Sequence, residues 1–244
     1  MRSVRVYVDA PLAEGARVRL APFAADHLVR VLRLPDGAKL ACFNGDGLEH
    51  AAMLEIAARG AVELRVGAAR ELHNESPLAI TLVQSIARGE RMDLILQKAT
   101  ELGVARILPV SSERTEVRLD EERAERRVAH WQRVVQSACE QCGRARVPLV
   151  EAPVALAVHA AAARELAMEK RVLQPDAAEG PSALAPCSAL MLAAGPEGGF
   201  SERDLALLVQ AGYRGLRLGP RVLRTETAGL AAVAALQSRF GDLV

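Results

Sequence analysis

The alternation of hydrophobic and polar positions changes once along this chain of 244 residues. Up to about residue 70, short alternating runs are separated by turn residues, a pattern typical of half-buried β-strands. Examples are "VRVYVDA", "ARVRLA" and "AVELRVGAAR", while Asn44-Gly45 and Asp46-Gly47 within "KLACFNGDGLEHAAMLEI" indicate a hairpin. One amphipathic segment, "AADHLVRVLR", interrupts the series. The first part therefore predicts a small, mostly β, barrel-like domain with one short helix.

After "ELHNESP" the pattern becomes an alternation of apolar runs and amphipathic segments. Strands are predicted at "LAITLVQSIA", "VARILPV", "VPLVEA", "KRVLQP", "ALMLAA" and "GLRLG". Helices are predicted at "ERMDLILQKATEL" with Gly103 at its end, from Glu121 to Cys142, from Ser201, and near Glu226 to Phe240, with an Ala-rich helix before "KRVLQP". Strands alternating with helices indicate an α/β fold with a mainly parallel sheet. We place the two domains at residues 1–72 and 73–244.

Composition adds little to this picture. Half of the residues are hydrophobic and a quarter are charged, as in ordinary globular proteins. No apolar run reaches the roughly 18–20 residues that cross a bilayer, and the first 20 residues do not resemble a signal peptide, so we expect a cytoplasmic protein without membrane contact. A net charge of +1 neither requires nor excludes a nucleic-acid partner. The preference for arginine over lysine suits phosphate binding, but codon bias would give the same skew.

The cysteines do not form a metal motif. Cys139 and Cys142 make a C-x-x-C, but it lies within a helical pattern and no second pair or nearby histidine supplies further ligands. We expect no metal site.

The segment "MLAAGPEGGFSERDL", residues 191–205, predicts a strand, a glycine-rich loop and a helix. It lacks the lysine of a phosphate-binding loop, and the charge of Glu197 would repel a phosphate. Ser201 and Asp204 form a capping-box pattern that occupies the helix N-terminus, where an anion would otherwise bind. The loop is either a purely structural turn or a site for a neutral or cationic ligand held by backbone groups.

A second strand-end loop of the same type occurs in "LRLGPRVLRTETAGLAAVAAL", residues 216–236. Parallel strands direct their carboxyl ends to one edge of a sheet, so we expect both loops to border one crevice. The second loop adds Arg224 and Glu226, which are either a structural ion pair or catalytic groups.

Together, "GPEGGFS" (195–201) and "LGPRVLRTETA" (218–228) resemble the SPOUT-class methyltransferases of the RsmE type. The resemblance extends over nearly the whole chain, through "HLVRVLRLPDG" (27–37), "QKATELGV" (97–104), "SERTEVR" (112–118), "WQRVVQSACEQCGRARVP" (131–148) and "ALQSRFGDL" (235–243). Cys142 stands where the family pattern leads us to expect Ser.

The resemblance implies a PUA-like N-terminal barrel and a C-terminal SPOUT domain with a deep trefoil knot. It implies methylation of N3 of a uridine in 16S ribosomal RNA, with S-adenosylmethionine as cofactor, the small ribosomal subunit as partner, and a homodimer. The cofactor contacts would be made by the two loops and by an earlier strand end, at positions Leu173, Gln174, Gly195, Glu197, Gly199, Leu218, Gly219 and Leu223.

For the reaction, we expect Arg224 to stabilise the charge that develops on the uracil oxygens. Glu226 would orient Arg224 or accept the N3 proton. RNA contacts are expected from histidine and arginine side chains in both domains, at His27, Arg30, Arg33, Arg88, Arg91 and Arg114, although solvated surface charge explains the last three equally well.

Two alternatives stay open from the sequence. One is another SPOUT methyltransferase that acts on a tRNA or on a ribose 2′-hydroxyl. The other is a non-catalytic RNA-binding assembly factor.

Overall fold

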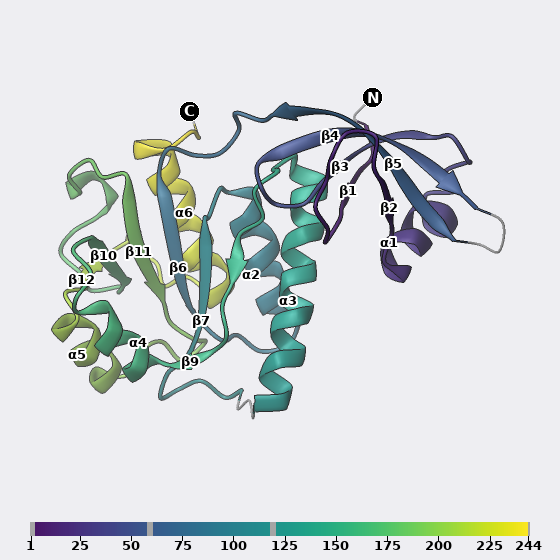
Figure 1. The fold of residues 1–244 in the computed structure, drawn as a ribbon. Coiled ribbons are helices and arrows are strands. Elements are labelled where there is room, and N and C mark those ends of the chain that lie inside the picture. The colour runs from purple at the N-terminus through teal and green to yellow at the C-terminus, as the bar shows by residue number, and fades with distance from the viewer. Residues whose placement is uncertain (1–2, 58–60, 118–120, 244) are drawn as a thin grey trace. The chain divides into compact units, whose positions relative to one another are not determined.

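The computed structural model describes residues 3–57, 61–117 and 121–243 (Figure 1). No helix within these ranges is long and apolar enough to cross a membrane. The chain divides into two compact units, one made of Met1–Glu75 with Gln136–Val147 and the other of Ser76–Val135 with Pro148–Val244.

The first unit differs from the sequence-predicted domain by one later segment. Residues 136–147, which the sequence analysis kept in the second domain, belong to the first unit. The reason lies in a small buried cluster, in which Cys139 and Ala145 pack on Phe43 together with the partly buried Tyr7 and Leu72. The last part of a long helix thus adds apolar side chains to a small β domain.

The first unit is built on a five-stranded sheet of order β1-β3-β4-β5-β2 within the described residues. Its only parallel pair there joins β1 to β3, and the other neighbours are antiparallel. The predicted hairpin is confirmed, since the Asn44 side chain accepts from the Asp46 N–H and Gly45 and Gly47 adopt φ of 98° and 100°. The elements are β1 (Arg5–Tyr7), β2 (Arg17–Arg19), α1 (Pro22–Asp26), η1 (His27–Val31), β3 (Lys39–Phe43), β4 (Leu48–Ile56) and β5 (Val62–Glu71).

The second unit contains a parallel sheet of order β12-β10-β11-β6-β7-β8, with β9 also paired to β7. The predicted strand–helix alternation is confirmed, and β8 and β9 are the shortest strands. The elements are β6 (Ala79–Ser85), α2 (Glu90–Glu101), β7 (Arg106–Ser111), α3 (Glu121–Cys142), β8 (Leu149–Val150), β9 (Val154–Ala155), α4 (Leu156–Ala163), β10 (Glu169–Leu173), η2 (Pro181–Ala183), β11 (Ala189–Ala194), α5 (Glu202–Gln210), β12 (Arg214–Leu216) and α6 (Thr225–Phe240).

Helices cover both faces of the parallel sheet (Figure 1). On β6, Val83 belongs to the cluster that includes residues of α4 and α5, whereas its neighbour Leu82 points toward Gly229 of α6. Successive side chains of a strand point to opposite faces, so α4 and α5 lie on one face and α6, which packs with α2, on the other. All of the sheet's pairings within the described residues are parallel, and the segments after β6, β7, β10, β11 and β12 therefore meet at one edge.

Helix α6 is only partly covered within a single chain. Its side toward the sheet is buried at Gly229, Ala232, Val233 and Leu236, whereas Leu230 and the alanines on its other side are half-buried. The sequence leads us to expect burial on every side for so apolar a helix, and one chain provides it on one side.

Candidate functional site

A cavity of about 140 Å³ lies where the segments after β10, β11 and β12 come together. The residues that the sequence analysis assigned to cofactor contacts all line it: Leu173, Gln174, Gly195, Glu197, Gly199, Leu218, Gly219 and Leu223. Ligand pockets commonly enclose roughly 300–1,000 Å³. A ligand larger than this cavity therefore has to extend onto the open surface beside it, where Val222 is 81% exposed.

The loop after β11 turns so tightly that it requires glycine. The Gly199 N–H donates to the Pro196 carbonyl at 2.8 Å, and Gly199 has a φ of +67°. A Cβ atom on Gly195 would lie 3.0 Å from the backbone nitrogen of Phe200, so tight a contact that the neighbouring backbone would have to move by a few tenths of an ångström. The two glycines thus bring bare backbone to the wall of the cavity.

A buried polar chain joins this loop to the start of α6. The Thr225 hydroxyl donates to the Gly195 carbonyl at 2.6 Å. The amide of Gln84, at the end of β6, lies 3.4 Å from the same hydroxyl and donates to the Ser85 carbonyl at 2.9 Å. The ends of β6 and β11 and the start of α6, which are distant in sequence, are thereby held together beneath the cavity.

Glu197 is held as a carboxylate at the edge of the cavity. Its Oε1 accepts from the Arg88 backbone N–H at 3.1 Å and from the Arg91 guanidinium at 3.0 Å. Partial burial raises the pKa of Glu197, but hydrogen bonds from the backbone N–H groups of Arg88 and of Glu197 itself, and then from Arg91, outweigh it and lower the pKa overall. Glu197 is therefore ionised at the edge of the cavity, where its carboxylate disfavours a phosphate and its charge is partly balanced by Arg91.

The second loop contributes apolar walls and unused backbone donors. Leu218 and Leu223 line the cavity, and Gly219 between them has a φ of +105°. Within the described ranges, the N–H groups of Leu218, Gly219 and Leu223 have no hydrogen-bond partner inside the protein. Such donors are available to hydroxyl, ring-nitrogen or carbonyl acceptors of a ligand.

The predicted capping box at α5 is confirmed. The Ser201 side chain accepts from the Asp204 N–H, and Asp204 accepts in return from the Ser201 N–H. The Asp204 carboxylate also accepts from the Glu113 N–H at 3.3 Å. The N-terminus of α5 is thus occupied by the protein's own carboxylate and is not free for an anionic ligand.

Arg224 and Glu226 do not pair with each other. Arg224 precedes α6 with extended backbone, and its exposed side chain has no hydrogen bond or ion pair with any residue the structure describes. Glu226, in the first turn of α6, has a side chain 17% exposed and lies 4.0 Å from Arg91. The helical start at Thr225 accounts for this, since N-terminal neighbours two positions apart point to different sides of a helix.

Two of the three arginines predicted to bind RNA phosphates contact the loop after β11 through their side chains. Arg91 pairs with Glu197, and Arg114 donates to the Gly198 carbonyl at 2.8 Å. The Arg88 side chain pairs with Glu116 at 2.7 Å, and both are well exposed. Sequence reasoning missed the Arg91–Glu197 pair, and no local signal indicates it, because the partners come from segments more than 100 residues apart. The last residue of the block 112–118 lies outside the described residues.

The other predicted RNA contacts lie in the first unit. His27 and Arg30 are exposed on η1, and Arg30 pairs with Asp26 at 3.3 Å. Arg33 follows with a φ of 53°, the one positive φ at a non-glycine residue in the described chain. The exposed side chains of Arg30 and Arg33 remain accessible to a polyanion.

Nothing in the described residues forms a metal cluster of three or more His, Cys, Asp or Glu side chains. Burial raises the pKa of Cys139 to about 12, so its thiol stays protonated at neutral pH.

Comparisons with known proteins cover both units. Residues 74–237 match the RNA methyltransferase domain family, and residues 24–67 match the RNA methyltransferase PUA domain. The ribosomal RNA small subunit methyltransferase E of Buchnera aphidicola subsp. Schizaphis graminum is 33% identical over 99% of this chain and 98% of its own, and that of Bacillus subtilis is 30% identical over 86% and 85%.

Two solved structures are similar to this chain over its full length. The ribosomal RNA small subunit methyltransferase E of Neisseria gonorrhoeae, determined with bound S-adenosylmethionine, is 38% identical over the full length of both chains, with a TM-score of 0.88. A Legionella pneumophila structure in complex with the same cofactor also covers both chains fully, at 38% identity and a TM-score of 0.94. The fold is a mixed α/β methyltransferase fold with a PUA-like N-terminal domain.

Proposed function

Because this chain belongs to the ribosomal RNA small subunit methyltransferase E family, we propose that it methylates N3 of a specific uridine in 16S ribosomal RNA with S-adenosylmethionine as methyl donor. The observation that carries the proposal is the convergence of the GPEGG and LGPRVL loops on one cavity with a fixed carboxylate and free backbone donors.

The residues of the cavity fit this cofactor. When bound, S-adenosylmethionine supplies an activated methyl group on a cationic sulfonium. The N–H groups of Leu218 and Gly219 would be available to adenine and ribose acceptors, and the walls formed by Leu173 and Leu223 would accept apolar ring faces. Glu197 provides a negative charge that favours a cationic ligand, and the occupied helix N-terminus of α5 removes the usual site of a phosphate.

The nucleophile is a weakly acidic imide nitrogen, so its proton has to leave as the new N–C bond forms. Glu226 is half-buried beside the site with Arg91 as its nearest cation, and it accepts the N3 proton. Arg224, whose side chain has no partner in the described protein, is available to stabilise the charge on the uracil oxygens. Positioning of the two reactants at the strand ends supplies much of the remaining rate.

The proposal extends to the finer fold and to the assembly. A deep trefoil knot at the loops after β11 and β12 is consistent with the strand order, in which α6 returns to pack on β6 and β11. A homodimer would cover the half-buried side of α6. The substrate is 16S ribosomal RNA, presented in the small ribosomal subunit, and the protein acts in the cytoplasm. His27, Arg30, Arg33, Arg88, Arg91 and Arg114 remain the proposed contacts to RNA.

The test is methyl transfer from labelled cofactor to naked 16S ribosomal RNA, to assembled small subunits and to tRNA, followed by nucleoside analysis. We expect 3-methyluridine as the labelled nucleoside. A label on a ribose 2′-hydroxyl, or on tRNA alone, would assign the chain to a different reaction of the same fold. Absence of cofactor binding by calorimetry would point to an RNA-binding assembly factor.

A further inference from the structure

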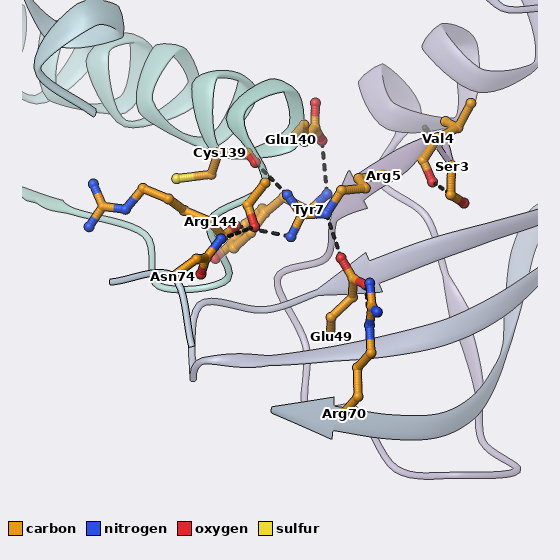
Figure 2. A network of polar contacts seen from close by, with 11 residues as sticks. Ser3, Val4, Arg5, Tyr7, Glu49, Arg70, Asn74, Cys139, Glu140 and Arg144 are labelled. Carbon is orange, nitrogen blue, oxygen red and sulfur yellow. Dashed lines mark hydrogen bonds and ion pairs between the residues drawn. The ribbon is translucent and has the colours of Figure 1, made fainter. Parts of the chain in front are cut away.

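A second cavity lies entirely in the first unit, away from the proposed methylation site. It measures about 640 Å³, within the roughly 300–1,000 Å³ of typical ligand pockets. Figure 2 shows a polar network beside it, with residues from β1, β4, β5, the last turn of α3 and the segments that adjoin these elements. The lining residues are Ser3, Val4, Arg5, His27, Leu32, Ala41, Glu49, Arg70, Leu72, Asn74, Ser137, Glu140, Gln141, Cys142 and Gly143.

A fixed ionic network forms one part of the lining. The Arg5 guanidinium donates to Glu49 at 2.6 Å and to the carbonyls of Cys139 and Arg144 at 2.6 and 3.1 Å (Figure 2). Glu49, with a side chain 6% exposed, also pairs with Arg70. Because the hydrogen bonds of Arg5 are made within the protein, we assign it a structural role, in which it maintains the shape of the cavity.

Other lining groups keep unused hydrogen-bonding capacity. Glu140 accepts from the Tyr7 N–H through Oε1 at 2.8 Å, and its Oε2 has no partner among the described residues. Asn74 donates to the Gly143 carbonyl at 2.9 Å, which leaves its own carbonyl oxygen as an acceptor. Burial raises the pKa of Glu140, which means that water solvates its charged form poorly and that a ligand N–H donor would stabilise it.

Apolar and cationic groups complete the cavity. Val4, Leu32 and Leu72 offer aliphatic surface, and His27 offers an imidazole ring. Arg70 is 71% exposed and has a terminal nitrogen, Nη1, without a partner in the described chain. A flat ring with N–H donors on its edge and an attached phosphate matches all of these features, because splayed-out bases of single-stranded RNA are held by stacking and by contacts to their edges.

We propose that this cavity binds one unpaired RNA base that carries an exocyclic amino group, with Glu140 and Asn74 as acceptors at its edge. Arg70 meets the adjoining phosphate, and the base lies between His27 and the aliphatic walls. Uracil is disfavoured, because the carbonyl at its position 4 would face the Glu140 carboxylate where cytosine presents an amino donor. The base that this cavity prefers therefore differs from the uridine that is methylated. The proposal rests on the proposed function only in that the bound RNA is the substrate of methylation.

The test compares single-stranded tetranucleotides of cytidine and of uridine, titrated against the full-length protein by fluorescence anisotropy. We expect the cytidine oligomer to bind at least tenfold more tightly. Glu140→Gln keeps an oxygen acceptor for the Tyr7 N–H but replaces the other oxygen with an amide donor, so the preference should fall below twofold. Glu14→Gln makes the same change of charge on an exposed residue of the same unit outside the cavity, and should keep the full preference.

A second variant blocks the cavity without touching the polar network. Leu32 is 41% exposed, and Leu32→Trp should fill the space and weaken binding of the cytidine oligomer at least tenfold, with an unchanged thermal midpoint. Equal binding of both oligomers by the wild type, or a preference that persists in both variants, would overturn the proposal. Cofactor titration and methylation of small subunits, run in parallel, report on the proposed function separately, since either result can fail without the other.

Discussion

Arg91 of α2 and Glu197 of the loop after β11 form an ion pair, with 3.0 Å between Nη1 and Oε1. The pair joins the segment that follows β6 to the segment that follows β11, two strands that are neighbours in the sheet. Arg91 also lies 4.0 Å from Glu226 on α6. One guanidinium therefore sits between the carboxylate that lines the cavity and the carboxylate proposed to accept a proton.

We expect Arg91→Ala to weaken binding of S-adenosylmethionine about fivefold (about 1 kcal/mol), because Glu197 loses a charged partner at a half-exposed site. Arg88 is the matched control, since it reaches Glu197 through its backbone N–H, which alanine retains. Isothermal titration calorimetry measures both. Equal losses in the two variants would show that the Arg91 side chain does not position Glu197.

Arg224→Ala should reduce the single-turnover rate of methyl transfer more than about tenfold (~1.4 kcal/mol) while leaving cofactor affinity unchanged, because its free guanidinium is proposed to act on the uracil oxygens. Arg217, exposed and outside the cavity lining, gives a control in which the same change should have little effect at saturating RNA. A loss below tenfold with intact cofactor binding would remove Arg224 from the reaction.

Thr225→Val should loosen the loop after β11, because the Gly195 carbonyl loses the hydroxyl that donates to it at 2.6 Å. An unsatisfied buried acceptor costs about 1–3 kcal/mol, so the free energy of unfolding should fall by that amount and cofactor affinity with it. Thr225→Ser retains the hydroxyl and should keep affinity near wild type. Urea denaturation and calorimetry check the two effects, and a serine variant as weak as the valine variant would contradict the assignment.

The sequence predicts those features of the site that are determined by residues close together in the chain. The turn at Gly199, the capping box of Ser201 and the order of strands and helices all follow from nearby residues, and the structure confirms them. The convergence of the strand ends follows from the parallel sheet.

Contacts between distant segments could not be predicted in the same way. The pattern placed Glu226 beside Arg224, but the helix begins between them, and the charge of Glu226 faces Arg91 instead. The membership of residues 136–147 in the first unit depends likewise on how Cys139 packs on Phe43, which no periodicity encodes.

His159 should make stability depend on pH. Burial, and then the nearby charge of Lys170, lower its pKa from 6.5 to about 4, and it lies 2.7 Å from the Tyr213 hydroxyl. Below pH 6.5, His159 binds a proton in the unfolded chain but not in the folded chain. The stability present above that pH is therefore lost as the pH falls toward 4, by on the order of 3 kcal/mol.

His159→Gln has no such titration and should flatten this part of the profile. Urea denaturation between pH 7 and 4.5 measures the difference between wild type and variant. Parallel profiles would mean that the folded protein protonates His159 as readily as the unfolded chain does.

The pairing of β6 with β11, in which Ala79 lies opposite Ala189, joins two segments that are far apart in the sequence. During translation, β6 and β7 are synthesised early, whereas β11 follows α3, α4 and β10. Helix α6 is synthesised after every strand of the sheet that the structure describes. Until β11 has been synthesised, one edge of β6 remains unpaired. Pairing between strands that are so far apart in the sequence slows folding. A nascent chain halted before α6 would have the PUA-like part complete but would lack Thr225 and Ala228 of the cavity lining, so the site is complete only after α6 has been translated.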